Sequence, residues 1–356
     1  MRITAMAFAA AAAVLPSVLA QSQCNEWSPC YREGYCDSSA MFCMWGLCDS
    51  SKSYNSTSCW QPETCESRTV DFSSSSDAVA VNSYSGNPQT NAFVSVFDPN
   101  HSSVADGNLV LSMKYDSAQN KGFGATVSAT HTFLYGKATA RVKTASIAPG
   151  VVSSFIYRSD VTGDEIDFEW VGKSPSEVQT NYYYRNVLNY QQMVPYTLTD
   201  TSAAFHDYSF EWTADKIVWS VDGTPIRTLN RADTYDAATG KYSFPDTRGR
   251  VAFSIWDGGN SGAQGTQEWA GYPTPWTAST VYSMYVDSIT IQCSGDDSTG
   301  GDSSSSAVGG DDGSSATDGS SATDGSSAPG GDDGSSATDG GDGSPPAKCI
   351  PRPTAY

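Results

Sequence analysis

The sequence predicts an all-β protein whose main domain is an antiparallel sandwich or jelly roll. From about Thr69 to Cys293, short stretches with strand patterning alternate with turn signals, and no long stretch has the 3.6-residue period of a helix. Some 225 residues of this kind suit one sandwich better than two domains. The clearest predicted strands are residues 109–113, 138–143, 163–172, 217–221 and 251–256. The turn signals are Asp106-Gly107-Asn108, Asp222-Gly223 and Asp257-Gly258-Gly259-Asn260.

The chain begins with features of a secretory signal peptide. Arg2 precedes an alanine-rich apolar run that ends in small residues at Ala20, so we expect residues 1–20 to be removed on export. The alternative is a membrane anchor, but the run is too short to span a bilayer. A secreted protein is therefore expected, without a membrane segment.

Cysteines concentrate near the N-terminus. Seven of the nine lie in residues 24–65, followed by Cys293 and Cys349, and an exported protein uses such cysteines as disulfides. Residues 24–65 have too few large apolar side chains for a core of their own. They form either a small disulfide-held module or an extension stapled to the main domain at residues 69–293. The odd count leaves one cysteine without a partner in the chain.

The net charge of −19 comes mainly from the C-terminal region. Residues 294–343 contain eleven Asp and no Lys, Arg or Glu, which leaves −8 for the rest and gives no sign of nucleic-acid binding. Residues 294–356 are rich in Ser, Gly and Asp, and the sequence GSSATDG recurs at 313–319 and 334–340. We expect a disordered, O-glycosylated tail because this composition cannot form a packed core.

Two short motifs refine the expected location. Residues 55–57 and 100–102 fit the N-glycosylation sequon, which an exported chain can use. The C-terminus lacks the hydrophobic tail of a GPI signal. The expected protein is a glycoprotein that is secreted to the extracellular space or the cell wall, with no GPI signal evident.

One predicted strand, residues 163–172, places three acids at alternating positions. Glu165, Asp167 and Glu169 therefore share one face of the strand, while the apolar residues between them share the other. A half-buried strand with a solvated polar face is the simpler interpretation. Like charges two residues apart repel, however, and Asp and Glu are poor strand formers. We therefore interpret the acidic face as a catalytic site.

The three acids suit glycoside chemistry with retention of configuration. Such enzymes need one carboxylate as nucleophile and a second carboxyl group as acid/base, held roughly 5 to 5.5 Å apart. We assign Glu165 as nucleophile, Glu169 as acid/base, and Asp167 as a helper that shares a proton with Glu165 and holds it in position. A straight strand would separate Glu165 from Glu169 by about 13 Å, so a concave sheet face is expected. The mechanism needs no metal or organic cofactor and is compatible with a structural calcium ion.

This strand matches the Glu-x-Asp-x-Glu motif of glycoside hydrolase family 16, which the sequence resembles from about Cys24 to Cys293. Within that family it is similar to the Crh cell-wall transglycosylases. Further segments carry the resemblance, namely residues 134–144, 179–183, 219–223, 254–260 and 265–266. The resemblance implies a β-jelly roll, a concanavalin-like sandwich, whose concave face holds the acidic strand at the floor of a sugar-binding cleft.

The resemblance also implies the residues that bind sugar. Gln179 and Asn181 would hydrogen-bond sugar hydroxyls, Trp219 and Trp256 would stack on sugar rings, and Thr266 would contact sugar near Trp256. Each has a simpler alternative. The two tryptophans could be core aromatics, and the two amides could satisfy backbone groups at a strand end.

The expected function is that of a secreted retaining β-glycan glycosidase or transglycosylase acting on cell-wall polysaccharide. The resemblance favours the transfer of chitin ends onto β-glucan, with these polysaccharides as donor and acceptor. We expect the protein to be a monomer. Residues 221–227 are also similar to plant xyloglucan transglycosylases of the same family, so the glycan stays open. Residues 24–65 resemble a degenerate chitin-binding module. Cys36 stands alone where such modules have an adjacent cysteine pair, and the spacing is altered, so chitin binding by this segment is not expected. The alternatives are a β-1,3/1,4-glucan hydrolase and a non-catalytic protein that binds wall glycans.

Overall fold

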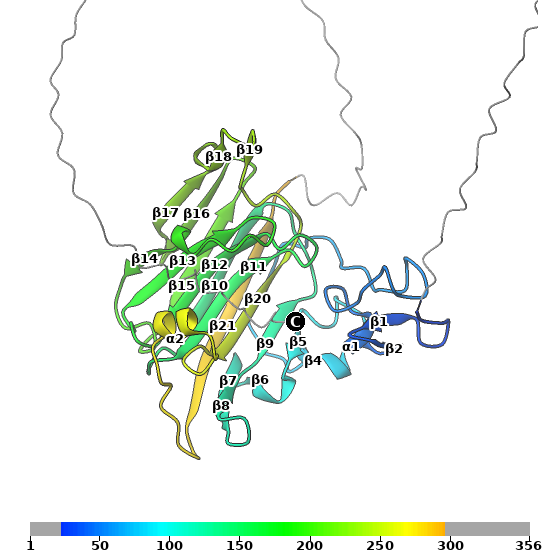
Figure 1. Ribbon diagram of the computed structural model, residues 1–356, viewed down its shortest axis with the longest axis horizontal. Helices are drawn as coiled ribbons and strands as arrows, with labels where there is room; N and C mark the ends of the chain where they lie inside the picture. The colour runs from blue at the N-terminus through cyan, green and yellow to red at the C-terminus, as the bar shows by residue number, and fades with distance from the viewer. Residues whose placement is uncertain (1–22, 296–356) are drawn as a thin grey trace, which may run out of the picture. The chain divides into compact units, whose positions relative to one another are not determined.

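Two β-sheets pack face to face in the computed structural model, which describes residues 23–295 (Figure 1). All strand pairs are antiparallel except β4 with β5, so the predicted all-β sandwich is confirmed. The expected signal peptide, nearly all of the expected tail and Cys349 lie outside the described residues.

The nine-stranded sheet has the order β17-β16-β15-β10-β21-β7-β6, with β3 paired to β21 and β8 paired to β7. Its strands are β3 (Arg68–Val70), β6 (Ser102–Ala105), β7 (Asn108–Asp116), β8 (Lys121–Phe123), β10 (Gly136–Lys143), β15 (His206–Trp212), β16 (Lys216–Val221), β17 (Thr224–Asn230) and β21 (Val281–Cys293).

The eight-stranded sheet has the order β14-β13-β12-β11-β20-β9-β5-β4 and contains the acidic strand as β12. Its strands are β4 (Ala78–Ala80), β5 (Phe93–Phe97), β9 (Thr126–Ala129), β11 (Val151–Arg158), β12 (Glu165–Val171), β13 (Glu177–Tyr183), β14 (Val194–Thr197) and β20 (Arg250–Asp257).

Smaller elements complete the described residues. They are the two hairpins β1 (Cys30–Arg32) with β2 (Tyr35–Asp37) and β18 (Tyr235–Asp236) with β19 (Lys241–Tyr242), the helices α1 (Ala40–Cys43) and α2 (Gln264–Ala270), and the 3₁₀ turns η1 (Val81–Ser83), η2 (Pro99–His101), η3 (Tyr190–Gln192) and η4 (Arg231–Thr234). The expectation that no long helix competes with the strands is confirmed within this range. No helix of the described chain is long and apolar enough to cross a membrane.

The core of the sandwich follows from the two-residue alternation of its strands. On β7, Leu109, Leu111 and Met113 are fully buried while the intervening side chains are more exposed. The same alternation on both sheets produces one large apolar cluster between them, rich in stacked aromatic rings such as Phe155 with Phe168. We call the face of the eight-stranded sheet that points away from this cluster the outer face.

Two of the predicted turns have the backbone geometry of tight hairpins. Asp106 and Gly107, between β6 and β7, have φ of 52° and 69°, and Asp222 and Gly223, between β16 and β17, have φ of 48° and 77°. Two successive residues with positive φ match the twist of the flanking strands, and the Asp-Gly pair tolerates that conformation. The Asp-Gly signals in the sequence therefore located both hairpins.

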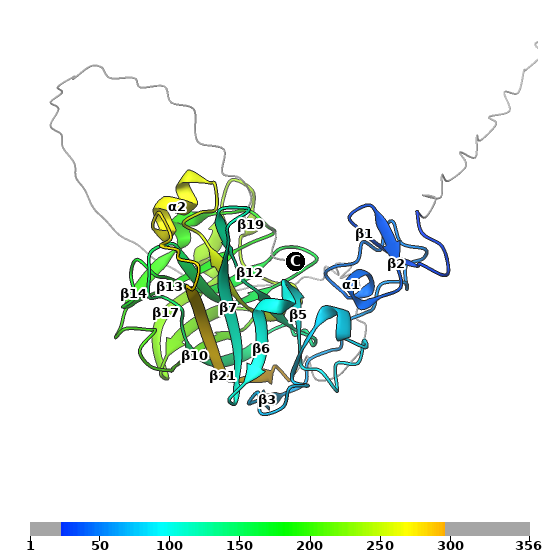
Figure 2. The same cartoon turned by 90° about the horizontal axis from the view of Figure 1, so that it is seen from below.

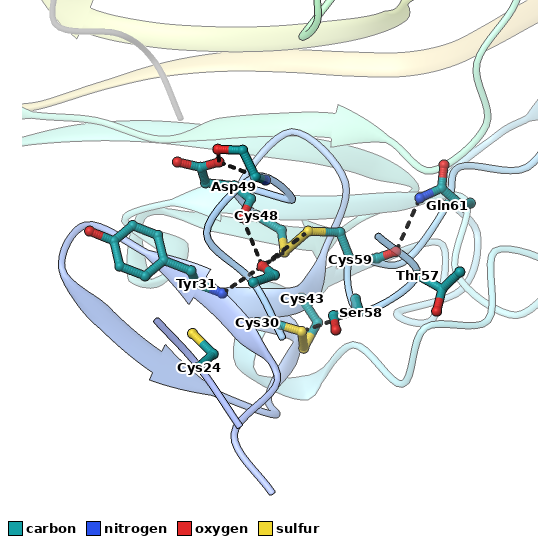
Figure 3. Close-up of a disulfide and its surroundings, with 12 residues drawn as sticks. Cys24, Cys30, Tyr31, Cys43, Cys48, Asp49, Thr57, Ser58, Cys59 and Gln61 are labelled. Carbon is teal, nitrogen blue, oxygen red and sulfur yellow. Dashed lines mark hydrogen bonds between the residues drawn. A yellow bond between two sulfur atoms is a disulfide. The ribbon is translucent and has the colours of Figure 1, made fainter. Parts of the chain in front are cut away.

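Four disulfides pair all eight cysteines of the described chain. Cys24–Cys36, Cys30–Cys43 and Cys48–Cys59 lie within residues 24–65, which we call the N-terminal module. Figure 3 shows the second and third of these disulfides. The fourth, Cys65–Cys293, joins the end of this module to the last strand of the sandwich. Both sequence alternatives are thus present, because the module has its own disulfides and is also stapled to the main domain.

Candidate active site

Strand β12 separates an apolar side from an acidic side. Ile166, Phe168 and Trp170 point into the sandwich and are fully buried, so the three acids point to the outer face. Glu165, Asp167 and Glu169 are themselves only 3%, 0% and 4% exposed. The predicted two-faced strand is confirmed, and its acids are enclosed by neighbouring groups on the outer face.

The neighbouring strands place further side chains beside each acid. In the register with β13 the opposite pairs are Glu165–Tyr183, Asp167–Asn181 and Glu169–Gln179. In the register with β11 they are Glu165–Arg158, Asp167–Ile156 and Glu169–Ser154. Directly opposite residues share a face of a sheet, so the structure brings the predicted amides Gln179 and Asn181 next to the predicted acids.

Arg158 is the basic group in contact with the acidic row. Its Nη1 donates to Glu165 Oε2, and its Nη2 donates to Asn186 Oδ1 at 3.3 Å. Glu165 is almost completely buried, whereas the side chain of Arg158 is 30% exposed. A guanidinium group presents several donors in a fixed plane, so this ion pair holds the Glu165 carboxylate in one orientation.

Asn181 lies beside Asp167 and is 3% exposed. Within residues 23–295, its Oδ1 is buried without a hydrogen-bond partner. A buried carbonyl oxygen without a donor costs free energy, and a hydroxyl group that approached the outer face would supply the donor. This geometry suits the predicted contact of Asn181 with a sugar hydroxyl.

Gln179 is tied to helix α2 through a tryptophan. Trp269 Nε1 donates to Gln179 Oε1 at 2.7 Å, and Gln179 Nε2 donates to Glu177 Oε1 at 2.9 Å. Trp269 also stacks on Trp256, with ring centroids 5.8 Å apart and planes at 25°. Trp269 could not be identified from the sequence, because α2 has only seven residues and a helix that short leaves no periodic pattern.

Trp256 and Thr266 lie at the α2 end of the outer face. Trp256 is partly buried against Val152 and Val171. Val171 lies on the outer face two residues beyond Glu169, and it pairs with Val152 on β11, which in turn pairs with Trp256 on β20. Thr266 is half-buried on α2. The structure therefore places both predicted sugar contacts on the same side of the acidic row.

The structure corrects the expectation that Trp219 stacks on a sugar ring. Trp219 lies on β16 of the other sheet and is fully buried in the core. Its Nε1 donates to the backbone oxygen of Asp167 at 3.1 Å, and the guanidinium of Arg227 lies 4.6 Å from its ring centroid. Alternation on β16 turns Trp219 inward, so the alternative of a core aromatic holds for this residue.

Arg227 supports β13, the neighbour of the acidic strand, through hydrogen bonds to backbone oxygens. Its Nη1 donates to Thr180 O at 2.8 Å, and its Nη2 donates to Gln192 O at 2.9 Å. Burial lowers the pKa of Arg227, and the charges of Tyr182 and Asp167 oppose that shift. Neither this residue nor Arg158 could be assigned from the sequence, because both depend on strand register across loops.

A further buried carboxylate, Asp164, immediately precedes the acidic row. Asp164 is fully buried and accepts hydrogen bonds from Arg185 N, Asp246 N, Thr247 N and Thr247 Oγ1 at 2.7–3.1 Å. It anchors two loops to the start of β12. The role of Asp164 could not be predicted from the sequence, because the groups that donate hydrogen bonds to it lie more than 20 residues away along the chain.

Asp257 organises the loop after β20 in the same way. It accepts from Gly122 N at 2.7 Å, Asn260 N at 2.9 Å and Trp276 Nε1 at 3.0 Å. The Asp257-Gly258-Gly259-Asn260 turn predicted from the sequence is therefore held by its first residue. Among the described residues, no group of three or more His, Cys, Asp or Glu is placed to hold a metal ion.

Comparison with known families agrees with this architecture. The sequence profile of glycosyl hydrolases family 16 matches residues 89–299, more than half of the chain, and this range includes the whole acidic strand. The chain belongs to glycosyl hydrolases family 16.

Two of its curated relatives come from Botryotinia fuckeliana and Saccharomyces cerevisiae. The chain is 36% identical to Crh-like protein 3 of Botryotinia fuckeliana over 280 residues, which is 76% of this chain and 60% of the relative. It is also 36% identical to Congo red hypersensitive protein 2 of Saccharomyces cerevisiae, over 77% of this chain and 58% of the relative. The chain thus spans about three fifths of the length of these curated relatives.

A solved structure is also similar. The Crh5 transglycosylase in complex with NAG superposes with a TM-score of 0.54 and 29% sequence identity, covering 65% of this chain and 86% of that chain. The predicted family and jelly-roll fold are confirmed.

Proposed function

We propose that this protein is a retaining cell-wall β-glycan transglycosylase whose active site is the outer face of the eight-stranded sheet. The observation that carries the proposal is the row of three acids on that face, in a chain of glycosyl hydrolases family 16. The outer face then forms the sugar-binding cleft, with the acidic strand at its floor.

In the proposed reaction, Glu165 attacks the anomeric carbon of the donor sugar while Glu169 protonates the departing glycosidic oxygen. A glycosyl-enzyme ester forms, and the first product leaves with its new hydroxyl group. Glu169 then removes a proton from the acceptor hydroxyl, which attacks the same carbon and releases Glu165. Asp167, between the two, keeps Glu165 in position, and Arg158 orients it from the other side.

The substrates proposed are polysaccharides of the wall, with chitin as donor and β-glucan as acceptor. This choice is supported by the relatives that are Crh-like proteins and by the similar structure of a transglycosylase in complex with NAG. Gln179, Asn181, Trp256 and Thr266 would contact the sugar. The competing function is hydrolysis of β-1,3/1,4-glucan, in which water takes the place of the acceptor.

We further propose that the protein acts outside the cell, as a monomer. Four disulfides in the described chain suit an oxidising compartment. Both sequon asparagines, Asn55 and Asn100, are exposed and would accept glycans. Export by the signal peptide at 1–20 and the division into a module at 24–65, a catalytic domain at 69–293 and a tail at 294–356 belong to this proposal.

The test uses purified full-length protein with chitin or laminarin as donor and fluorescent oligosaccharides as acceptors. Labelled polymer is expected from the wild type, and Glu165→Gln and Glu169→Gln should each reduce its rate by about a thousandfold or more. Thermal denaturation shows whether each variant is folded. Normal transfer by either folded variant would refute the assignment, and release of reducing sugar without labelled polymer would favour the hydrolase.

A further inference from the structure

Two arginines lie side by side on the outer face of the eight-stranded sheet. Arg158 on β11 is directly opposite Arg250 on β20. Both point outward, because their neighbours Tyr157 and Val251 are buried in the core. The Cβ atoms of directly opposite residues are about 5 Å apart, so two guanidinium groups at these positions repel each other. Each arginine therefore needs an acidic partner of its own.

The two arginines have different carboxylates as partners. Arg158 holds Glu165, the first acid of the row. Arg250 Nε instead lies 2.8 Å from Asp160 Oδ2, and the Arg250 side chain is only 6% exposed. Asp160 follows Arg158 by two residues, in the connection between β11 and β12. The four side chains therefore form two ion pairs next to each other, one of which contains the proposed nucleophile.

Asp160 is a potential competitor for Arg158. Two residues of extended chain span no more than about 7 Å, so the backbones of Asp160 and Arg158 are close together. The guanidinium of Arg158 also faces more than one acceptor, since its Nη2 donates to Asn186 Oδ1 at 3.3 Å. A nearby aspartate without a partner would attract Arg158 by the same charge-assisted hydrogen bonding that Glu165 uses. The ion pair with Arg250 occupies Asp160 and prevents this exchange.

Further contacts fix Arg250 in the orientation that meets Asp160. Its Nη2 donates to the backbone oxygen of Trp45 at 3.2 Å, and its Nη1 donates to that of Ala129 at 3.5 Å. The guanidinium also lies 5.6 Å from the centroid of the Trp45 ring. A planar guanidinium with donors in fixed positions cannot keep these contacts and turn to another partner. Trp45 belongs to the N-terminal module, so the module takes part in holding Arg250.

The N-terminal module is itself held against the eight-stranded sheet. Val94 and Val96 of β5 form an apolar cluster with Ala40, Met44 and Leu47 of the module. Helix α1 and β5 lie side by side in both views (Figures 1 and 2). The module therefore presents its backbone acceptor at a fixed place on the sheet.

Gly46 lets the backbone of the module approach the second ion pair closely. It has φ of +83°, and a Cβ atom there would lie 2.6 Å from Arg250 Nη2 and 2.7 Å from Asp160 Oδ2. Any side chain at this position would push the two charged groups aside or displace the module. The module is thus fitted to the pair of Arg250 with Asp160.

We propose that Arg250 is a positioning residue for the nucleophile Glu165. By occupying Asp160, Arg250 leaves Arg158 free to hold the nucleophile, and the N-terminal module contributes by fixing Arg250. Without Arg250, Arg158 would turn to Asp160, and Glu165 would lose the partner that orients it. The inference rests on the proposed function, in which Glu165 attacks the anomeric carbon, and it gives the module a share in that reaction.

The test compares single and double variants of the full-length protein in the transfer assay. Arg250→Met should lower kcat about tenfold with little change in KM, because the nucleophile is misplaced while the sugar contacts remain. Adding Asp160→Asn to Arg250→Met should restore kcat to within about threefold of the wild type, since the competing carboxylate is gone. In an Arg158→Met background, Arg250→Met should cause no further loss, because it acts through Arg158.

Arg141→Met is the matched control, because Arg141 forms two ion pairs of its own on the nine-stranded sheet. It should leave kcat and KM unchanged. Gly46→Ala perturbs the same ion pair without removing a charge, so it should lower kcat as Arg250→Met does and should also be relieved by Asp160→Asn. This second route tests the inference if Arg250→Met does not fold, which thermal denaturation shows.

A crystal structure of Arg250→Met gives a readout that does not depend on turnover. It should show Arg158 hydrogen-bonded to Asp160 in place of Glu165. Equal kcat in the folded Arg250→Met protein and the wild type would overturn the inference. A double variant with Asp160→Asn that is no more active than Arg250→Met would overturn it as well, because that result assigns Arg250 a purely structural role.

The two proposals fail in different ways. If the wild type transfers no sugar but Arg158 moves to Asp160 in the Arg250→Met structure, the proposed reaction is wrong and the exchange of ion pairs stands. If the wild type is active, Glu165→Gln is inactive and Arg158 still holds Glu165 in the Arg250→Met structure, the reaction stands and the role of Arg250 is wrong.

Discussion

Two groups of buried carboxylates lie within a few residues of each other and differ in what surrounds them. Asp164 accepts four hydrogen bonds from backbone and side-chain donors of two loops. Glu165, Asp167 and Glu169 face polar side chains across β11 and β13 and a guanidinium. A carboxylate tied into loop backbone stabilises the fold, whereas the carboxylates grouped on the outer face are the ones that we propose carry out the chemistry. Burial alone does not distinguish the two.

The adjacent pair Asp164 and Glu165 should separate stability from activity most strongly. Asp164→Asn replaces one of the two acceptor oxygens with a donor, which must then face at least the N–H of Arg185, so we expect a loss on the order of 3 kcal/mol in the free energy of unfolding. For a domain of this size that is roughly 5 to 10 °C in Tm. Glu165→Gln should abolish transfer and change Tm by less than about 2 °C. Denaturation and transfer assays on both variants check this, and a stable Asp164→Asn protein would show that the loop anchor is dispensable.

Asp167 should behave like the outer-face acids although it is as fully buried as Asp164. Asp167→Asn removes the group proposed to hold Glu165, so kcat should fall on the order of a hundredfold with little change in KM. Its Tm should stay the same or rise, because a buried charge is removed from an acidic cluster. Steady-state kinetics and denaturation measure both. A large drop in Tm with unchanged kcat would assign Asp167 to the structural group.

Two tryptophans extend the same comparison to neutral side chains. Trp219→Leu should cost about 3 kcal/mol, because it removes a fully buried ring and its hydrogen bond to Asp167 O. Trp256→Leu should raise KM for glycan about tenfold and cost less than about 1.5 kcal/mol, since Trp256 is partly buried at the edge of the outer face. Urea denaturation and donor-saturation curves test the pair, and the reverse pattern would contradict our correction for Trp219.

His131 gives the smallest expected effect, on the pH dependence of stability. Burial, with the charge of Arg68 second, lowers the pKa of His131 below its usual value of about 6.5. The folded protein therefore binds this proton less readily than the unfolded chain. The contribution of neutral His131 to the free energy of unfolding is present above about pH 6.5, and it is lost as the pH falls through the pKa of His131 in the folded protein. His131→Gln should show a shallower decline in Tm between about pH 7 and pH 5, and parallel curves would refute this.

Local sequence patterns were sufficient for the five strands that we predicted and for the acidic row on one of them. The two-residue alternation of Glu165, Asp167 and Glu169 against Ile166, Phe168 and Trp170 is a property of one strand, and the Asp-Gly pairs at 106–107 and 222–223 are properties of one turn. Such signals can be recognised without knowing which strands lie beside them. The predicted amides Gln179 and Asn181 lay on the next strand, where family resemblance supplied the match.

Only the tertiary structure decided which side chains meet. The pairing of Arg158 with Glu165 depends on the register across residues 159–164, and that of Trp45 with Arg250 joins positions about 200 residues apart. Trp219 and Trp256 have similar strand contexts, yet one points between the sheets and the other to the outer face. A sequence specifies the period of alternation, but the face that becomes the core is chosen when a second sheet covers it. For that reason the acidic row could be predicted from one strand, while the residues that hold and border it could not.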